Sequence, residues 1–324
     1  MTARATPVPT LAPTLVMAGL DPAIPPRPAR ATELARSGAD GRVKPGHDGR
    51  AAGRRIGAAV GLLLAATTPA AAAPWLPPAG HGVVKPMLRL FDAQTGFSPT
   101  GWTTDPTAGP TERETQLRVT GEAGLGHGFA LEYDLRYGFL SKIRRKGKHD
   151  LASFAHGPRD QEIGLAHRLV ATRQMAAALV LNVVIPTGSA ATTPALGTGR
   201  WAIEPDLALG RRWDGGRVGI SAQVGPRIFL DGDAEQLRAT LTLDAALGRG
   251  FRLSGEAFFS RTARNRRPLP APASGEAYDI LRLGGALSYR LRPGVAPFLG
   301  YERYVAGQGI HAGERFVMGV ELSY

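Results

Sequence analysis

Large apolar side chains alternate with small or polar ones along most of this chain. At the C-terminus the apolar positions are Phe316, Met318, Val320, Leu322 and Tyr324, and the positions between them are Val317, Gly319, Glu321 and Ser323. Successive side chains of an extended strand point to opposite faces, so this pattern predicts a strand with one apolar and one polar face. We expect the apolar face to contact lipid and the other face to line a lumen.

The same period of two recurs in about twelve segments between residues 83 and 324, most clearly over 129–139, 218–224 and 237–247. Each segment has about 9–13 residues, enough for a tilted strand to cross a bilayer. Only a closed sheet pairs every backbone group in hydrocarbon. The predicted fold is therefore all-β, a closed antiparallel transmembrane β-barrel of about twelve strands. A soluble β-sandwich with the same alternation is the alternative.

The links between these segments predict which end of the barrel faces the periplasm. Alternate links are short, at 123–127, 169–174, 213–216, 247–250 and 291–294. The links between them are mostly longer and more polar, at 92–111, 140–158, 187–199, 263–275 and 305–312, with a brief link at 230–234 as the exception. Short periplasmic turns and longer outer loops are typical of outer-membrane barrels. Candidates for interfacial aromatic girdles are Trp201, Trp213, Phe251, Phe298, Tyr301, Tyr304 and Tyr324.

Residues 51–72 have the features of a secretory signal peptide: Arg54 and Arg55, a short Leu-rich run and small residues at the end. We expect cleavage after Ala72, which leaves residues 73–324 as the barrel in the outer membrane of a Gram-negative bacterium. A buried Ala-rich helix is the alternative. Residues 1–50 are rich in Pro, Ala, Gly and Arg without apolar periodicity. They are either a disordered extension or a stretch upstream of the true translation start.

Composition excludes several classes of protein. After the leader, no apolar run is long enough for a membrane-spanning helix, so a multi-helix membrane protein is excluded. The net charge of +12 falls to +7 over residues 73–324, where basic residues are spread out except at 142–148, so no nucleic-acid partner is expected. The absence of Cys fits an exported protein that relies on a closed hydrogen-bonded sheet.

The parity of the charged residues predicts a lumen lined by both signs of charge. The candidates for lining it are Arg118, Glu122, Glu132, Asp134, Arg136, Glu204, Asp206, Arg227, Arg238, Asp244, Arg252, Glu256, Arg282, Glu302 and Glu321, together with Glu162 and Arg168. Two interpretations are open. The charges either form a salt-bridged, hydrated plug that keeps the wall rigid, or they line a selective passage for a polar or amphipathic solute.

No catalytic site, metal site or cofactor is expected. His167 lies within a predicted strand but on its lipid-facing parity, where a general base has no use. Glu132 with Asp134, and Glu204 with Asp206, place two carboxylates on one face, which could support acid–base chemistry or hold a divalent ion. Inward pairs at strand spacing more often meet arginines across the sheet, so we predict that the protein is not an enzyme.

One segment carries a more particular resemblance. An apolar strand, 179–185, ends in Pro186-Thr187-Gly188; Leu196-Gly197-Thr198-Gly199 and then Pro205-Asp206-Leu207 follow. Together with Gly121-Glu122, Tyr133 and Tyr137-Gly138, this resembles, over about residues 95–324, the outer-membrane proteins named for the meta-pathway of phenol degradation. The resemblance implies an outer-membrane barrel with a role in uptake of aromatic or other hydrophobic compounds. It assigns no binding residue.

The sequence thus predicts an outer-membrane channel or transporter for small solutes, including aromatic or hydrophobic ones. The expected partners are outer-membrane lipid and lipopolysaccharide, the barrel-assembly machinery through the C-terminal strand, and a small-molecule solute. The alternative function is a structural or surface-interaction barrel that acts through its outer loops without transport. In that case the basic segment Lys142–Lys148 would pair with lipopolysaccharide phosphates.

Overall fold

The computed structural model describes residues 74–98, 101–102, 104–105, 111–146, 149–231, 234–265, 279–308 and 310–324. The predicted N-terminal extension and signal peptide lie outside these residues. Within the described part of the chain, no helix has the length and hydropathy needed to cross a bilayer.

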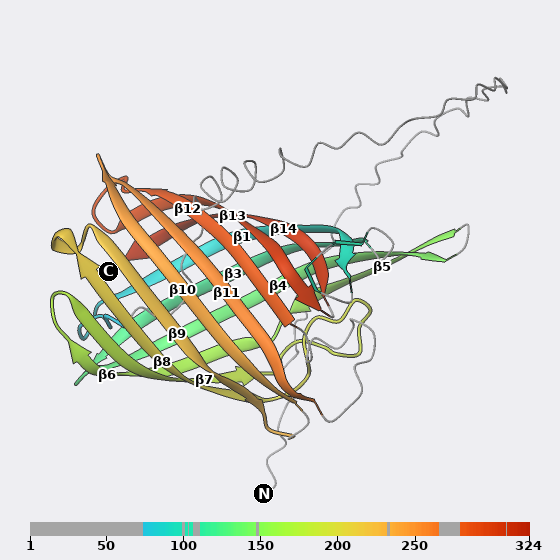
Figure 1. Cartoon of the computed structure of the whole chain (residues 1–324), viewed down its shortest axis with the longest axis horizontal. Helices are drawn as coiled ribbons and strands as arrows, with labels where there is room; N and C mark the ends of the chain where they lie inside the picture. The colour runs from blue at the N-terminus through green and yellow to red at the C-terminus, as the bar shows by residue number, and fades with distance from the viewer. Residues whose placement is uncertain are drawn as a thin grey trace, which may run out of the picture. The chain divides into compact units, whose positions relative to one another are not determined.

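Twelve long strands close into an antiparallel barrel, which confirms the predicted fold class (Figure 1). They are β1 (Gly82–Phe97), β3 (Thr111–Gly126), β4 (Phe129–Lys146), β6 (Gln161–Ala171), β7 (Met175–Ile185), β8 (Ala202–Trp213), β9 (Val218–Phe229), β10 (Ala234–Gly248), β11 (Phe251–Asn265), β12 (Asp279–Tyr289), β13 (Val295–Gln308) and β14 (His311–Ser323). The first and last strands pair from Val83 with Ser323 to Gly96 with His311. This pairing removes both sheet edges, whose backbone groups could find no partner in hydrocarbon.

Two further strands lie at the outer end of the barrel. β2 (Thr104–Asp105) pairs with the end of β1. β5 (His149–Pro158) pairs with the outer half of β4, and the two form a hairpin that projects from the barrel in Figure 1. The prediction of a loop at 140–158 is therefore wrong, because strand pairing continues beyond the barrel wall. The long link predicted at 305–312 is also wrong, since only residues 309–310 separate β13 from β14.

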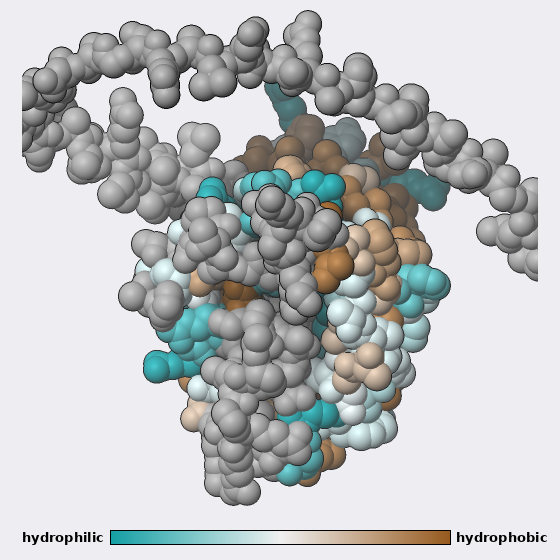
Figure 2. Space-filling model, turned by 90° about the vertical axis from the view of Figure 1, so that its right-hand side faces the viewer, coloured by the Kyte–Doolittle hydropathy of each residue, from teal (hydrophilic) through white to brown (hydrophobic). Residues whose placement is uncertain are grey.

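The short links lie together at the end of the barrel that carries the C-terminus, as the sequence predicts for the periplasmic side (Figure 1). Two of these turns depend on backbone with positive φ. His127 between two glycines has a φ of 51°, and Arg249, also between two glycines, has a φ of 51°. The glycines on either side also have positive φ, which glycine adopts without steric cost. Each link can therefore reverse the chain direction within two residues. Figure 2 views the opposite end, where hydrophilic residues are distributed around the rim among apolar ones.

The two faces of the strands separate as their parity predicts. On β4, Leu131, Leu135 and Phe139 are exposed on the outside, whereas Ala130 and Asp134 are buried on the inside. Aromatic pairs add to the outer face, with ring centroids 4.8 Å apart for Phe251 and Tyr289 and 5.2 Å apart for Tyr301 and Phe316. The prediction of an interfacial position is wrong for two of the aromatic residues. Phe298 and Tyr304 share the parity of Glu302 and line the lumen.

Candidate functional site: the barrel lumen

The lumen holds a cavity of about 920 Å³ with chemically distinct levels. Because each strand contributes alternate residues, one level of the wall is a ring drawn from many strands. The outer level combines apolar side chains with charged ones, the middle level is a girdle of charges, and below it lies a small acidic group. The periplasmic level is lined by small residues.

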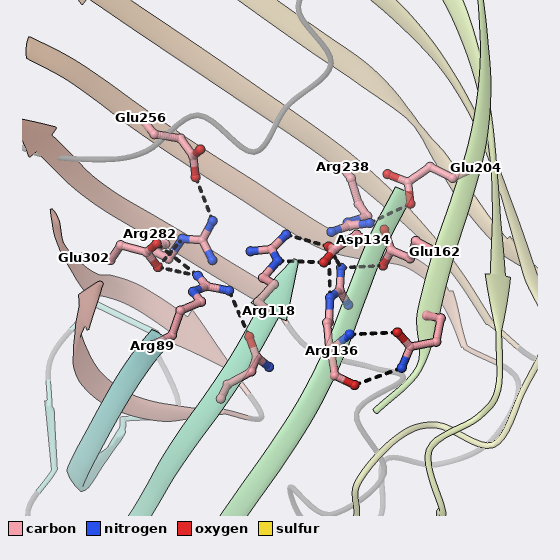
Figure 3. A network of polar contacts seen from close by, with 12 residues as sticks. Arg89, Arg118, Asp134, Arg136, Glu162, Glu204, Arg238, Glu256, Arg282 and Glu302 are labelled. Atoms are coloured by element: carbon pink, nitrogen blue, oxygen red, sulfur yellow. Dashed lines mark hydrogen bonds and ion pairs between the residues drawn. The ribbon is translucent and has the colours of Figure 1, made fainter. Parts of the chain in front are cut away.

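Glu302 on β13 is the centre of the densest charge cluster. Arg89 on β1 donates two hydrogen bonds to the Glu302 carboxylate, at 3.0 and 2.9 Å, and Arg315 on β14 donates one at 3.1 Å. Arg282 on β12 lies 3.4 Å from the same carboxylate and also donates a hydrogen bond of 2.7 Å to Glu256. The side chain of Glu302 is only 5% exposed. One buried carboxylate thus joins four consecutive strands around the barrel seam. Figure 3 shows Glu302 with Arg89 and Arg282.

A second cluster lies on the facing side of the lumen. Arg118 on β3 donates bidentate hydrogen bonds of 2.7 and 2.5 Å to Asp134 on β4, and Arg136 also pairs with Asp134. Arg136 reaches Glu162 on β6 at 3.0 Å. The chain of pairs continues from Glu162 through Arg227 to Glu204 and Arg238. Figure 3 shows the Arg136–Glu162 pair and the Arg238–Glu204 pair.

Most of these charges are buried, with exposed fractions of 5–21% for the side chains in both clusters. Taking an ion out of water costs several kcal/mol, so such residues are retained when each meets an opposite charge and hydrogen-bond partners. Together the clusters form an almost continuous girdle of paired charges around the lumen. The geometry favours a rigid polar constriction over a set of independent charged side chains.

An acidic group lies below the girdle, formed by Glu122, Glu132 and Asp206. Asp206 accepts hydrogen bonds from Asn182 at 3.2 Å and from Gln223 at 2.7 Å. Lys85 nearby pairs with Glu321 at 2.9 Å. Among the described residues, no set of three His, Cys, Asp or Glu side chains is arranged to hold a metal ion.

The outer level of the cavity is built from buried apolar side chains on several strands and one loop. They are Phe91 on β1, Leu140 on β4, Val184 on β7, Phe229 on β9, Ile280 on β12 and Leu196 in the β7–β8 loop. Each is at most 7% exposed. Charged side chains share this level, because Glu114 pairs in register with both Phe91 and Leu140. Glu112 and Lys142 line the cavity further out. A solute that enters from outside therefore meets apolar and charged surface side by side.

The segment that precedes β1 occupies the periplasmic level. Leu76 packs in a pocket of Ala130, Ala166, Ala178 and Ala208, and its carbonyl oxygen accepts a hydrogen bond of 2.8 Å from Arg168. The guanidinium of Arg212 lies 3.9 Å from the centroid of the Trp75 ring. Gly210 on β8 gives this ring room, because a Cβ there would overlap Trp75. The segment narrows the lumen at this end.

A model of the family described as "Putative MetA-pathway of phenol degradation" matches residues 169–318. The predicted resemblance is confirmed over this segment. Among solved structures, the fold is similar to a COG4313 outer membrane channel from Pseudomonas putida F1, with a TM-score of 0.55 and 12% identity, covering 76% of this chain and 97% of that one. A NanC porin is more distant, with a TM-score of 0.44 and 10% identity over 73% of this chain and 98% of that one. No curated protein matches the sequence.

Closed topology and an apolar outer face make the chain an outer-membrane β-barrel, which agrees with the predicted location. The Pro-Thr-Gly motif that carries the family resemblance lies at the end of β7, where Pro186 begins the β7–β8 loop. Proline lacks the N–H that continued pairing requires, so the strand ends there.

The structure places fifteen of the seventeen predicted lumen candidates on the cavity wall: Arg118, Glu122, Glu132, Asp134, Arg136, Glu162, Glu204, Asp206, Arg227, Arg238, Asp244, Arg252, Glu256, Arg282 and Glu321. Arg168 instead donates a hydrogen bond to the Leu76 carbonyl oxygen. Glu302, the remaining candidate, lies behind the arginines that it binds. Asp244 and Arg252 pair with each other at 2.6 Å nearer the periplasm. That these residues act on a solute stays a prediction.

Several girdle residues escaped the sequence reasoning, among them Arg89, Glu114, Arg159 and Arg315. Arg159 donates a hydrogen bond of 2.5 Å to Glu114, and Arg315 belongs to the Glu302 cluster. Parity could have found Arg315, which alternates with Phe316 in β14. Arg159 has no such signal, because it lies in the break between β5 and β6.

The basic segment at 142–148 does not lie wholly in an outer loop. Lys142 belongs to β4, lines the cavity, and has its Nζ atom 3.7 Å from Glu112 on β3. Strand parity turns it inward, away from any outer surface. The side chains of residues 144–148 lie outside the described residues, so their pairing with lipopolysaccharide stays a prediction.

Proposed function

We propose that this protein is an outer-membrane channel for small amphipathic solutes, including aromatic ones, and that it performs no covalent chemistry. One observation carries the proposal, namely that buried apolar side chains at the outer level lie next to paired charges within one cavity. A solute with an apolar body and a polar end complements both levels. The name of the Pseudomonas putida structure, an outer membrane channel, supports the same reading.

The magnitudes favour a solute with an apolar part over a fully polar one. Removing ~100 Å² of a phenyl ring from water gives about 2.5 kcal/mol, at about 25 cal/mol per Å². A sugar gains little of this free energy. It must also give up hydrogen bonds to water and compete for side chains that already have partners. The charged girdle then offers both signs of charge to the polar end of the solute, so that end stays in a polar environment at this level.

The proposal also includes the partners of a membrane-embedded barrel. Outer-membrane phospholipid would contact the apolar outer face, and lipopolysaccharide would contact the outer rim. The assembly machinery would engage β14, whose outward residues Phe316, Met318, Leu322 and Tyr324 continue to the end of the chain.

A pair of solutes with equal charge tests the role of the apolar level. In proteoliposome swelling, we expect benzenesulfonate to enter faster than methanesulfonate, although it is larger, because its ring binds the outer level. Replacing Val184 by Thr keeps the side-chain volume, whereas replacing Ile280 by Thr also removes one carbon. Together the two changes should abolish this preference. Each change places a hydroxyl on the wall that the ring would contact.

Val218→Thr is the matched control, because Val218 is exposed on the outer face of β9. It should leave the preference intact. Swelling at the background rate for both solutes, with the barrel correctly folded, would instead favour a structural barrel without transport.

A further inference from the structure

The β7–β8 loop, residues 186–201, bends into the outer mouth of the lumen. Residues 190–198 of the loop line the cavity, and Leu196 is only 4% exposed. A loop in this position limits the width of the mouth, provided that something holds it there.

A single carboxylate joins the two ends of this loop. Asp160 Oδ1 accepts a hydrogen bond of 3.2 Å from the Gly188 N–H. Asp160 Oδ2 accepts one of 2.7 Å from the Thr198 N–H and one of 2.8 Å from the Thr198 hydroxyl. Asp160 is 9% exposed, and no cation pairs with it within the described ranges. Its charge is therefore stabilised mainly by these donors from the loop.

A break in the barrel wall places Asp160 where it can reach the loop. β5 and β6 run in the same direction beside β4, separated by Arg159 and Asp160. The Gln161 side chain fills the interrupted ladder, accepting a hydrogen bond of 2.7 Å from the Arg136 N–H and donating one of 2.9 Å to the Arg136 carbonyl oxygen. The Arg136 N–H thus has a side-chain partner, whereas its carbonyl oxygen also accepts a hydrogen bond of 3.0 Å from the Arg159 N–H. Asp160, next in the chain, directs its carboxylate to the loop.

Glycines in the family motif make this contact possible. A Cβ at Gly188 would lie 2.8 Å from both the Leu196 carbonyl oxygen and the Gly197 Cα. A Cβ at Gly197 would overlap the Asp160 carboxylate. The Thr187 hydroxyl adds a hydrogen bond of 2.6 Å to the Arg159 carbonyl oxygen. The Pro-Thr-Gly and Gly-Thr-Gly sequences thus meet at the break between β5 and β6.

We propose that Asp160 is the positioning residue that holds the β7–β8 loop in the outer mouth and so sets the largest solute that enters. The size limit rests on the proposed channel function, whereas the fixed position of the loop does not. Three donors from two separate parts of the loop make this carboxylate a strong restraint on it, since hydrogen bonds to a charged group are about twice as strong as neutral ones. The ion pair between Arg200 and Asp231 restrains only the end of the loop next to β8.

Loop mobility tests the first half of the proposal without any solute. The chain has no Cys, so Ala191→Cys, at an exposed loop position, provides a unique site for a nitroxide label. Asp160→Asn places an amide NH₂ against the loop N–H donors. We expect it to increase the mobile fraction in the spin-label spectrum about tenfold, as for the loss of one hydrogen bond to a charged group.

The size limit is measured on the same proteins by liposome swelling with neutral sugars from arabinose to raffinose. Asp160→Asn should admit larger sugars than the parent does. Thr198→Val keeps the N–H contact with Asp160 and removes the hydroxyl contacts with Asp160 and with the Arg200 backbone. It should shift both readouts in the same direction by a smaller amount. Thr198→Val also tests the proposal if heat-modifiable migration shows that Asp160→Asn does not fold. Asp214→Asn, at an exposed periplasmic position, is the matched control and should change neither readout.

Two results would overturn the proposal. An unchanged spectrum in correctly folded Asp160→Asn would show that other contacts hold the loop. A mobile loop with an unchanged sugar limit would show that the loop does not set it. If the loop becomes mobile but no solute enters any variant, the channel function fails while Asp160 keeps its role in holding the loop.

Discussion

Replacing Glu302 by Gln is expected to lower the free energy of unfolding by about 3–5 kcal/mol, the usual cost of removing one partner from a buried charge cluster. Gln keeps the size and one acceptor but removes the charge that Arg89, Arg282 and Arg315 share. Among the described residues, Glu302 is the one carboxylate that pairs with Arg89. The measurement is urea unfolding of the barrel in lipid vesicles, followed by tryptophan fluorescence.

The matched control is Asp214→Asn. Asp214 lies 3.7 Å from Arg217 in a periplasmic turn, where both side chains are more than 60% exposed. Exposed pairs of this kind contribute about 0–1 kcal/mol, so the unfolding midpoint should hardly move. Equal, small changes for the two variants would contradict a stabilising role for the girdle.

Glu302→Gln should also shift the ion selectivity of the pore toward anions, because one negative charge is lost from the wall.

The second large effect is expected from Gly210→Val. A Cβ at position 210 would overlap the Trp75 ring and lie 2.6 Å from Pro74 Cγ, so the valine should displace the segment that precedes β1. Because this segment occupies part of the lumen at the periplasmic end, its displacement should widen the path for ions. We expect single-channel conductance in a planar bilayer to rise severalfold.

Combining Gly210→Val with removal of the segment that precedes β1 distinguishes displacement of this segment from a general disturbance of β8. In a chain that begins at Pro78, Trp75 and Leu76 are absent and the periplasmic level is already open. Gly210→Val should then add nothing to the conductance, because both changes remove the same obstacle. An undiminished effect in the shortened chain would show that the valine acts on the wall itself.

The sequence by itself determined the wall of this protein. A period of two over many segments specifies strands and also specifies which residues face lipid, because the two faces of a strand are set by parity alone. Leu131 and Asp134 on β4 lie on the predicted faces for this reason. The short turns were also predictable, since they require few residues and glycines such as those beside His127 and Arg249.

Only the tertiary structure decided which side chains meet inside the barrel. Arg89 and Glu302 are separated by 213 positions in the chain and become partners because β1 pairs with β14. Parity specifies a face but not a register or a neighbour across the lumen. The same limit applies to Asp160, which lies outside any alternating pattern and gains its role from a break in one strand and a loop that returns to it. Leu76 likewise packs into a pocket formed by four alanines on four different strands. That pocket exists only once the barrel has closed.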